Sequence, residues 1–206
     1  MLHHAAGPVC ALGAFVALWM VGSAQAADIW VNPYGTVRLD GWIVQGDDIK
    51  FANITKGYPP GTYVSLSGPG GNLGVALDIG NIIQERGFST LQVGRNGPCA
   101  SACALLMFSG HHVVVENNSL LCFHMPYRPN TNQPISWDEV LLLADELGHW
   151  GLTKKQAVAI IGAAPPSGIR CATVQWAQEL EFQYSVVSSL FLLWRSCATR
   201  FCLAVP

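Results

Sequence analysis

Two residues of this chain could perform nucleophilic chemistry together, Ser101 and His124. Ser101 lies in the small-residue run CASAC at the start of a predicted helix, and His124 ends an apolar strand predicted over 119–123. A serine becomes a nucleophile only when a base within reach can take its proton. Alone, Ser101 would be interpreted as a helix N-cap and His124 as a structural residue. Their shared stretch also holds a glycine run, which favours a joint chemical role.

The elements before Ser101 predict how the stretch is built. Residues 63–66 form a β-rich run, the segment 67–71 (SGPGG) breaks it, and a strand is expected over 90–93. The segment between them is a predicted helix that ends at Gly87. Its apolar residues recur at helical spacing: Leu73, Ala76, Ile79, Ile82 and Ile83. A strand, helix and strand in this order predict a parallel pair of strands with a right-handed crossover.

The glycine run allows two interpretations. Most such runs are only tight turns. A glycine-rich turn before a helix can also bring backbone N–H groups close to a developing negative charge. GPGGNLG fits neither the phosphate-binding GxxxxGK pattern nor the dinucleotide fingerprint.

Together these features resemble the superfamily of the Clp protease proteolytic subunit and the crotonases. The chain is most similar to exported, Clp-like members of bacterial periplasmic type. The shared pattern is a PGG turn, a helix, a strand, a serine among small residues, and a histidine after one further pair of strands. Here it covers about residues 37–127. The resemblance implies an α/β fold, a spiral of β-β-α units with a parallel sheet and helices packed outside.

The resemblance also implies roles for individual residues. Ser101 matches the nucleophile and His124 the general base. The N–H groups of Gly71 and Ala102 match an oxyanion hole, which stabilises the tetrahedral intermediate.

The acid that completes the family's triad has no counterpart in the expected neighbourhood. That neighbourhood, 162–167 (GAAPPS), precedes a predicted helix over 173–180 and contains no carboxylate. The helix expected over 137–149 carries four candidates for a replacement acid: Asp138, Glu139, Asp145 and Glu146. Exposed carboxylates on a helix are usually only solvated. Without an acid, a serine and histidine pair should be slower, because nothing fixes the imidazole tautomer.

Composition excludes several other classes of function. Only 12% of the 206 residues are charged and the net charge is −2, so no basic field would attract nucleic acid. His111, His112 and His149 could join His124 as metal ligands, but HExxH spacing is absent and no metal or cofactor is expected.

The N-terminus predicts export. The first 26 residues contain no charged side chain, and the apolar run 9–21 closes on Ala24-Gln25-Ala26, which is typical of a signal peptide cut after Ala26. An uncleaved membrane anchor is the alternative. Export would remove Cys10 and favour disulfides among the remaining cysteines, with at least one of Cys99, Cys103 and Cys122 oxidised.

The sequence therefore predicts a signal peptide (1–26), a Clp-like α/β domain (27–184) and an apolar tail (185–206). The first functional hypothesis is a secreted or periplasmic serine hydrolase, a peptidase acting on peptides or esters. The second is a catalytically inactive module that binds a peptide or partner protein. Acyl-CoA chemistry and an ATPase partner are disfavoured outside the cytoplasm, and a Ser-Lys mechanism lacks a lysine near Ser101. The apolar helices after 137 could pack over the sheet or form a homo-oligomer contact.

Overall fold

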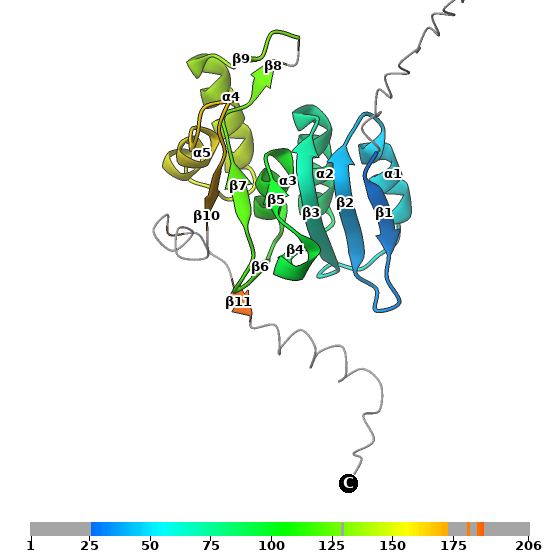
Figure 1. Cartoon of the computed structure of the whole chain (residues 1–206). Coiled ribbons are helices and arrows are strands. Elements are labelled where there is room, and N and C mark those ends of the chain that lie inside the picture. Colours follow the sequence, from blue (N-terminus) through cyan, green and yellow to red (C-terminus); the bar gives the residue numbers. More distant parts are fainter. Residues whose placement is uncertain (1–25, 129, 173–180, 182–184, 188–206) are drawn as a thin grey trace, which may run out of the picture.

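The computed structural model describes residues 26–128, 130–172, 181 and 185–187 of the chain (Figure 1). The predicted signal peptide, except for its last residue, lies outside the described residues. So do the helix expected over 173–180, most of the apolar tail and the cysteines Cys197 and Cys202.

The described elements follow the predicted order closely. The strands are β1 (Asp28–Val31), β2 (Val37–Ile43), β3 (Tyr63–Gly71), β4 (Ser89–Gln92), β5 (Cys99–Ala100), β6 (Val113–Glu116), β7 (Leu121–Phe123), β8 (Tyr127–Arg128), β9 (Gln133–Pro134), β10 (Arg170–Ala172) and β11 (Ser185–Val187). The helices are α1 (Asp47–Ile54), α2 (Leu73–Glu85), α3 (Ala102–Leu106), α4 (Trp137–Gly148) and α5 (Lys154–Ile161), with 3₁₀ turns η1 (Gly94–Asn96) and η2 (Met107–Ser109).

The fold is of the mixed α/β class, with a mostly parallel sheet. Within the described residues nine strands form one sheet, and β8 and β9 form a separate hairpin. Strand β3 is its centre: β2 pairs with one edge, while β4 and β5 pair with successive parts of the other. From there two rows of strands continue, β4-β6-β11 and β5-β7-β10. Only the pairs β1·β2 and β7·β10 in this sheet are antiparallel.

The sequence predicts that the glycine run ends the strand, and this prediction is wrong. The run forms the last part of β3. β3 continues to Gly71 and pairs with β2 through a register shift between Asp40 and Trp42. The reason is backbone freedom: Gly68, Gly70 and Gly71 have φ values of 129°, 95° and 140°, which side-chain-bearing residues rarely adopt. The strand can therefore bulge and still keep its neighbours.

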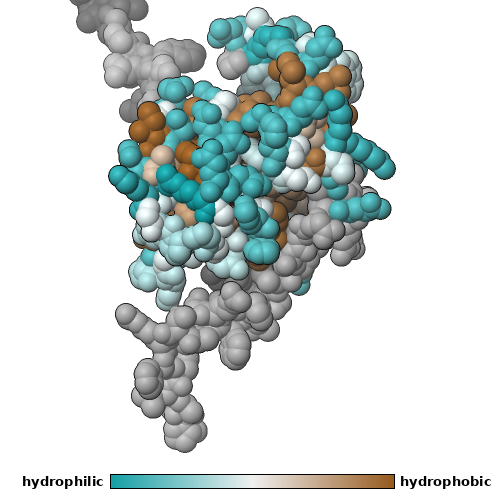
Figure 2. All heavy atoms as spheres, turned by 180° about the vertical axis from the view of Figure 1, so that it is seen from behind, coloured by the Kyte–Doolittle hydropathy of each residue, from teal (hydrophilic) through white to brown (hydrophobic). Residues whose placement is uncertain are grey.

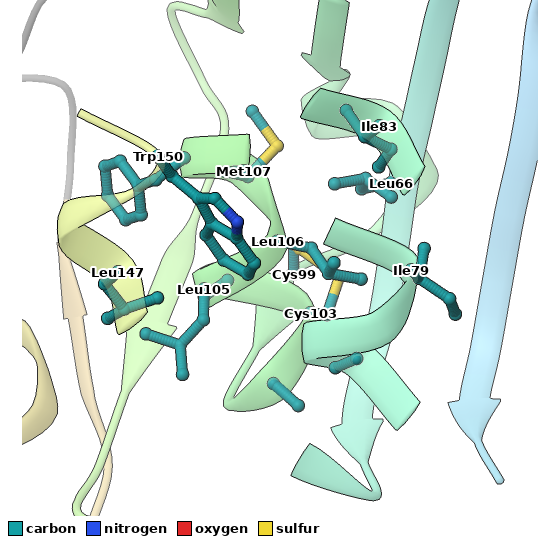
Figure 3. Packing of buried hydrophobic residues seen from close by; sticks show 14 of the residues in the cluster. Leu66, Ile79, Ile83, Cys99, Cys103, Leu105, Leu106, Met107, Leu147 and Trp150 are labelled. Carbon is teal, nitrogen blue, oxygen red and sulfur yellow. A yellow bond between two sulfur atoms is a disulfide. The ribbon is translucent and has the colours of Figure 1, made fainter. Parts of the chain in front are cut away.

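The prediction for helix α2 is confirmed, and one face of it is buried against the sheet. Asn72 caps the helix, accepting from the Val75 N–H at 3.2 Å, and Ile79 and Ile83 are fully buried. Figure 3 shows α3 packed between this helix and the end of α4. A side chain at Gly80 would overlap the Trp150 indole, so the missing Cβ lets Trp150, which follows α4, pack closely on α2.

Two disulfides join cysteines of the described chain, Cys99–Cys103 and Cys122–Cys171. The prediction that at least one of Cys99, Cys103 and Cys122 is oxidised is confirmed. Disulfides persist in oxidising compartments, so the pairing points to an extracytoplasmic environment. Across the part of the chain that the structure describes, no helix is long and apolar enough to cross a bilayer.

The surface is largely hydrophilic on the face shown in Figure 2, with separate hydrophobic areas. Trp42 is 48% exposed, whereas its neighbour Ile43 is 1% exposed. Successive strand residues point to opposite faces, so only one of the two can face the core.

Candidate active site

Ser101 occupies a strained backbone position between strand β5 and helix α3. Its φ and ψ are 54° and −126°, in a region that residues with a Cβ rarely adopt. Its N–H donates to the Cys122 carbonyl at 2.7 Å, and its carbonyl accepts from the Leu105 N–H at 3.2 Å. Strain of this kind persists only where the surrounding structure fixes it, and it concentrates at functional sites. A serine on a sharp strand-to-helix turn projects its hydroxyl away from the sheet, as a nucleophile requires.

Gly70 lies directly against this turn. A Cβ at Gly70 would lie 2.8 Å from both the Ser101 Cβ and the Ala102 nitrogen, and 2.6 Å from the Ala100 oxygen. Carbon atoms do not approach at these distances, so only glycine allows β3 to contact the serine turn. The glycine run and Ser101, 30 residues apart in sequence, are therefore brought together.

The two predicted oxyanion-hole residues lie beside this contact. Ala102 is the first residue of α3, and its N–H has no acceptor among the residues that the structure describes. The first N–H groups of a helix lack intrahelical partners and are available to an anion. Gly71 follows Gly70, and the next N–H, of Asn72, is used by the Ile43 carbonyl at 2.8 Å. The end of β3 is thus anchored to β2 immediately beyond Gly71.

His124 follows strand β7, which is the parallel neighbour of β5. The register pairs Ala100 with Cys122, so Ser101 and His124 both leave the carboxyl ends of adjacent strands. Both residues are partly exposed. The His124 ring stacks on Tyr127, with ring centroids 5.9 Å apart. No hydrogen bond joins the Ser101 hydroxyl to His124 in this structure.

The His124 ring is held by a backbone carbonyl. Its Nδ1 lies 2.9 Å from the Met125 oxygen. A carbonyl can only accept, so this bond requires a proton on Nδ1, and in the neutral ring Nε2 is then left as the acceptor. Nε2 is the atom that must be free to take a serine proton.

The segment in which the acid was expected contacts the same residue. Met125 donates its N–H to the Ala164 carbonyl at 2.8 Å, and Ala164 lies in the run 162–167 after α5. The segment therefore reaches the residue next to His124, but its carbonyl binds the Met125 N–H and not the imidazole ring.

Three of the four candidate acids of α4 have partners other than His124. Glu139 accepts from Arg128 at 2.6 Å and from the Ser136 N–H at 2.7 Å, and the Ser136 backbone bond lowers the pKa of its carboxyl. Asp145 pairs with Lys154 at 2.9 Å. Glu146 accepts from Asn81 at 3.2 Å. Neither these three nor Asp138 is hydrogen-bonded to His124.

Two of the other histidines considered as metal ligands contact groups outside the candidate site. His111 contacts the Gln84 carbonyl at 3.1 Å, and His149 lies 3.6 Å from Glu146. Within the described ranges, His, Cys, Asp and Glu side chains form no group of three that could hold a metal ion.

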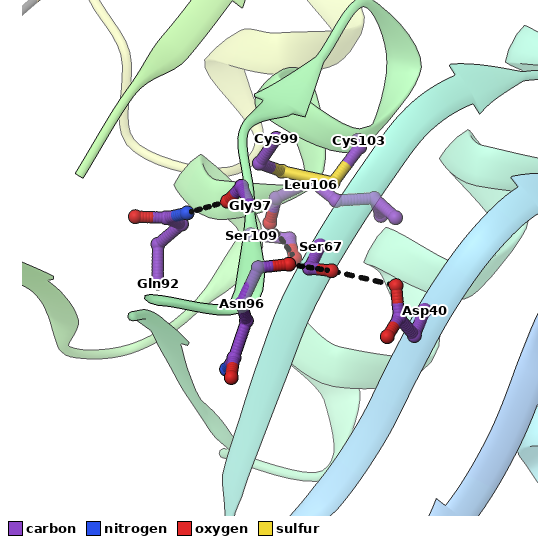
Figure 4. The surroundings of a disulfide bond; sticks show 9 residues. All are labelled: Asp40, Ser67, Gln92, Asn96, Gly97, Cys99, Cys103, Leu106 and Ser109. Carbon is purple, nitrogen blue, oxygen red and sulfur yellow. Dashed lines mark hydrogen bonds between the residues drawn. A yellow bond between two sulfur atoms is a disulfide. The ribbon is translucent and has the colours of Figure 1, made fainter. Parts of the chain in front are cut away.

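The loop that carries Ser101 is fixed on both sides. Figure 4 shows Cys99–Cys103, which brackets the serine, together with the bonds that hold the preceding loop. The Ser67 hydroxyl lies 2.6 Å from Asp40 Oδ1 and 3.0 Å from the Asn96 carbonyl, and Gln92 donates to the Gly97 carbonyl at 2.8 Å. These bonds tie the segment before β5 to β2, β3 and β4.

Sequence reasoning missed Gly70, Met125 and Ala164 as parts of this arrangement. For Gly70 a signal existed, since any glycine of the run could have made the close approach. Met125 and Ala164 act through backbone carbonyls, which leave no trace in residue type.

Comparison with known proteins assigns the chain to no family. No protein-family model matches the chain, and no curated protein is significantly similar to it.

Proposed function

We propose that the protein is an exported serine hydrolase, a peptidase, with the spiral fold of the Clp protease and crotonase superfamily. The observation that carries the proposal is the backbone of Ser101, φ 54° at the start of α3, closed on one side by Gly70. Support for the fold comes from the two rows of strands that leave β3, in which every pair except β7·β10 is parallel. Support for the activity comes from His124, which leaves the neighbouring strand on the same edge.

In the proposed mechanism, the His124 Nε2 takes the Ser101 hydroxyl proton as the serine oxygen attacks the carbonyl carbon of a peptide or ester. The N–H groups of Ala102 and Gly71 stabilise the negative charge on the former carbonyl oxygen. The imidazolium then gives its proton to the leaving group, which departs to leave an acyl-serine. Water, deprotonated by His124, hydrolyses this ester and restores the serine.

In this proposal the Met125 carbonyl takes over one task of the missing acid. An orienting aspartate holds the imidazole in the correct tautomer and also stabilises the imidazolium by its charge. A carbonyl supplies the first effect fully and the second only through its dipole. We therefore expect a lower turnover rate than that of an enzyme with a complete triad.

Export is part of the proposal. The charge-free apolar start and the Ala24-Gln25-Ala26 site favour cleavage after Ala26, and the two disulfides favour an oxidising destination. The site needs no cofactor, metal or ATPase partner for this chemistry. An uncleaved anchor would leave the domain in the same compartment.

One observation favours a second candidate function, a catalytically inactive module that binds a peptide or partner protein. The Ser101 hydroxyl is not hydrogen-bonded to His124, and no described carboxylate orients the ring. The same strand ends would then form a binding site without turnover.

The two candidates are separated by assaying the mature protein with chromogenic esters and a fluorogenic peptide library. The hydrolase proposal predicts turnover that Ser101→Ala reduces by at least about 10³-fold. Ser167→Ala is the matched control, because Ser167 is exposed in the loop after α5 and should change nothing. Turnover that survives Ser101→Ala would contradict the hydrolase proposal. Peptide binding without turnover would favour the binding module.

A further inference from the structure

A nearly buried carboxylate, that of Asp47, lies at the start of the domain. Asp47 opens helix α1 and is 3% exposed. Its Oδ2 accepts two backbone N–H groups, from Val44 at 2.8 Å and from Ala27 at 3.3 Å. None of the ion pairs among the described residues includes Asp47. A buried carboxylate is costly unless a positive charge or several hydrogen bonds compensate it.

The lysine of the same helix is used elsewhere. Lys50, one turn along α1, donates its Nζ to the Ala27 carbonyl at 3.0 Å. Ala27 is itself 1% exposed, so both its nitrogen and its oxygen are enclosed by α1. The Ala27 nitrogen is therefore the atom at which a positive charge would best compensate Asp47.

The predicted cleavage would produce a charge at this atom. Hydrolysis of the Ala26–Ala27 peptide bond consumes one water, releases the leader with the Ala26 carboxylate, and leaves an amine at Ala27 that takes up a proton. The same cut removes Ala26, which forms a parallel bridge with Trp42 in the uncleaved chain.

We propose that removal of the leader creates a buried ion pair between the α-ammonium of Ala27 and the carboxylate of Asp47, which locks the N-terminus of the mature domain onto helix α1. The inference rests on the proposed cleavage after Ala26, but not on hydrolase activity. The ammonium has three protons, enough for Asp47 and for further acceptors, where the peptide had one.

The ion pair would also stabilise the candidate active site, through strand β2. Asp47 also holds the N–H of Val44, the residue after Ile43. The Ile43 carbonyl accepts from Asn72 at 2.8 Å, directly beyond the glycine end of β3. Processing would thus brace the end of β2 against which Gly71 packs.

The test compares two chains that both end at Pro206 and are made with a removable tag, so that either Ala27 or Ala26 becomes the first residue. The longer chain keeps a peptide N–H at Ala27 and carries its ammonium one residue away. We expect the Ala27 chain to have a Tm several degrees higher. In the Asp47→Asn background this difference should disappear. Equal Tm values, or an equal difference with and without Asp47, would overturn the ion pair.

A second measurement covers the case in which Asp47→Asn does not fold. In the wild-type Ala27 chain, ¹⁵N NMR of the labelled α-amino group should give a pKa well above its ordinary value of about 8. A pKa at or below that value would overturn the proposal. Mass spectrometry of the N-terminus from the native host tests the cleavage separately: a start other than Ala27 refutes the processing step, whatever the hydrolase assays show.

Discussion

The Nδ1 atom of His124 lies 2.9 Å from the carbonyl oxygen of Met125, the next residue in the chain. The Met125 N–H in turn donates to the Ala164 carbonyl at 2.8 Å, so the residue that accepts from the imidazole is itself held by the segment after α5. This relationship gives a physical reason why the imidazole can present Nε2 without a neighbouring aspartate.

The first prediction concerns the tautomer of His124. Because a carbonyl can only accept, neutral His124 should carry its proton on Nδ1. The measurement is the pair of ring ¹⁵N chemical shifts in selectively labelled protein at alkaline pH, where imidazoles are neutral. His112 is the internal control, since its exposed ring has no hydrogen-bond partner among the described residues and should show the tautomer mixture of a free imidazole. A His124 ring protonated on Nε2 would contradict this account of the site.

The second prediction concerns the helix α4 carboxylates. None of the four is hydrogen-bonded to His124, so Asp138→Asn, Glu139→Gln, Asp145→Asn and Glu146→Gln should each leave turnover within about twofold. His124→Ala is the reference for a true loss and should lower turnover by about 10³-fold or more. A large loss in any one of the four variants would instead identify that carboxylate as the replacement acid.

The third prediction concerns the contact between Gly70 and the serine turn. In Gly70→Ala the new Cβ would lie 2.6 Å from the Ala100 oxygen, so β5 or Ser101 must move. We expect turnover to fall by about 10²-fold, the cost of a displacement near 1 Å. Gly61→Ala is the matched control, because Gly61 also has a positive φ, 81°, but nothing within 4 Å of its missing Cβ. It should lose only about 1–2 kcal/mol of stability from backbone strain. Equal turnover in both variants would be incompatible with the close approach.

The fourth prediction separates the two disulfides. Cys122–Cys171 closes a sequence separation of 49 residues and Cys99–Cys103 one of 4. From chain entropy, the paired serine substitutions should cost about 4 kcal/mol for the first and about 2 kcal/mol for the second. Urea unfolding measures both. The Cys99–Cys103 bridge lies on both sides of Ser101 in sequence. Removing this bridge should therefore reduce turnover by more than its small stability loss alone would cause. A reversed order of the two stability losses would show that loop closure is not the main contribution.

The sequence allowed the elements around the site to be predicted because their signals are local. Helix α2 follows from the spacing of Ile79 and Ile83, and its start from Asn72. Only the resemblance suggested that Ser101 and His124 are neighbours, because β6 lies between β5 and β7 in the chain and pairs with β4 instead. Periodicity could not show that β3 continues through its glycines, because positive φ values break the alternation on which strand prediction depends.

The remaining features depend on contacts between distant segments. The partner of Cys122 is Cys171, which the sequence could not select among several cysteines. Packing of Trp150 on Gly80 and the bond from Ala27 to Asp47 join residues 70 and 20 positions apart. Such pairs are determined by how the helices dock on the sheet, and residue types alone do not specify them.

The most direct test of the central claim is to locate the adduct of a fluorophosphonate on the mature, oxidised protein by peptide mass spectrometry. A serine activated by His124 should form one covalent phosphonyl ester, on Ser101, and Ser101→Ala and His124→Ala should each abolish it while Ser167→Ala labels normally. An unlabelled wild-type protein, or an adduct that maps to another residue, would contradict the assignment of Ser101 as the nucleophile.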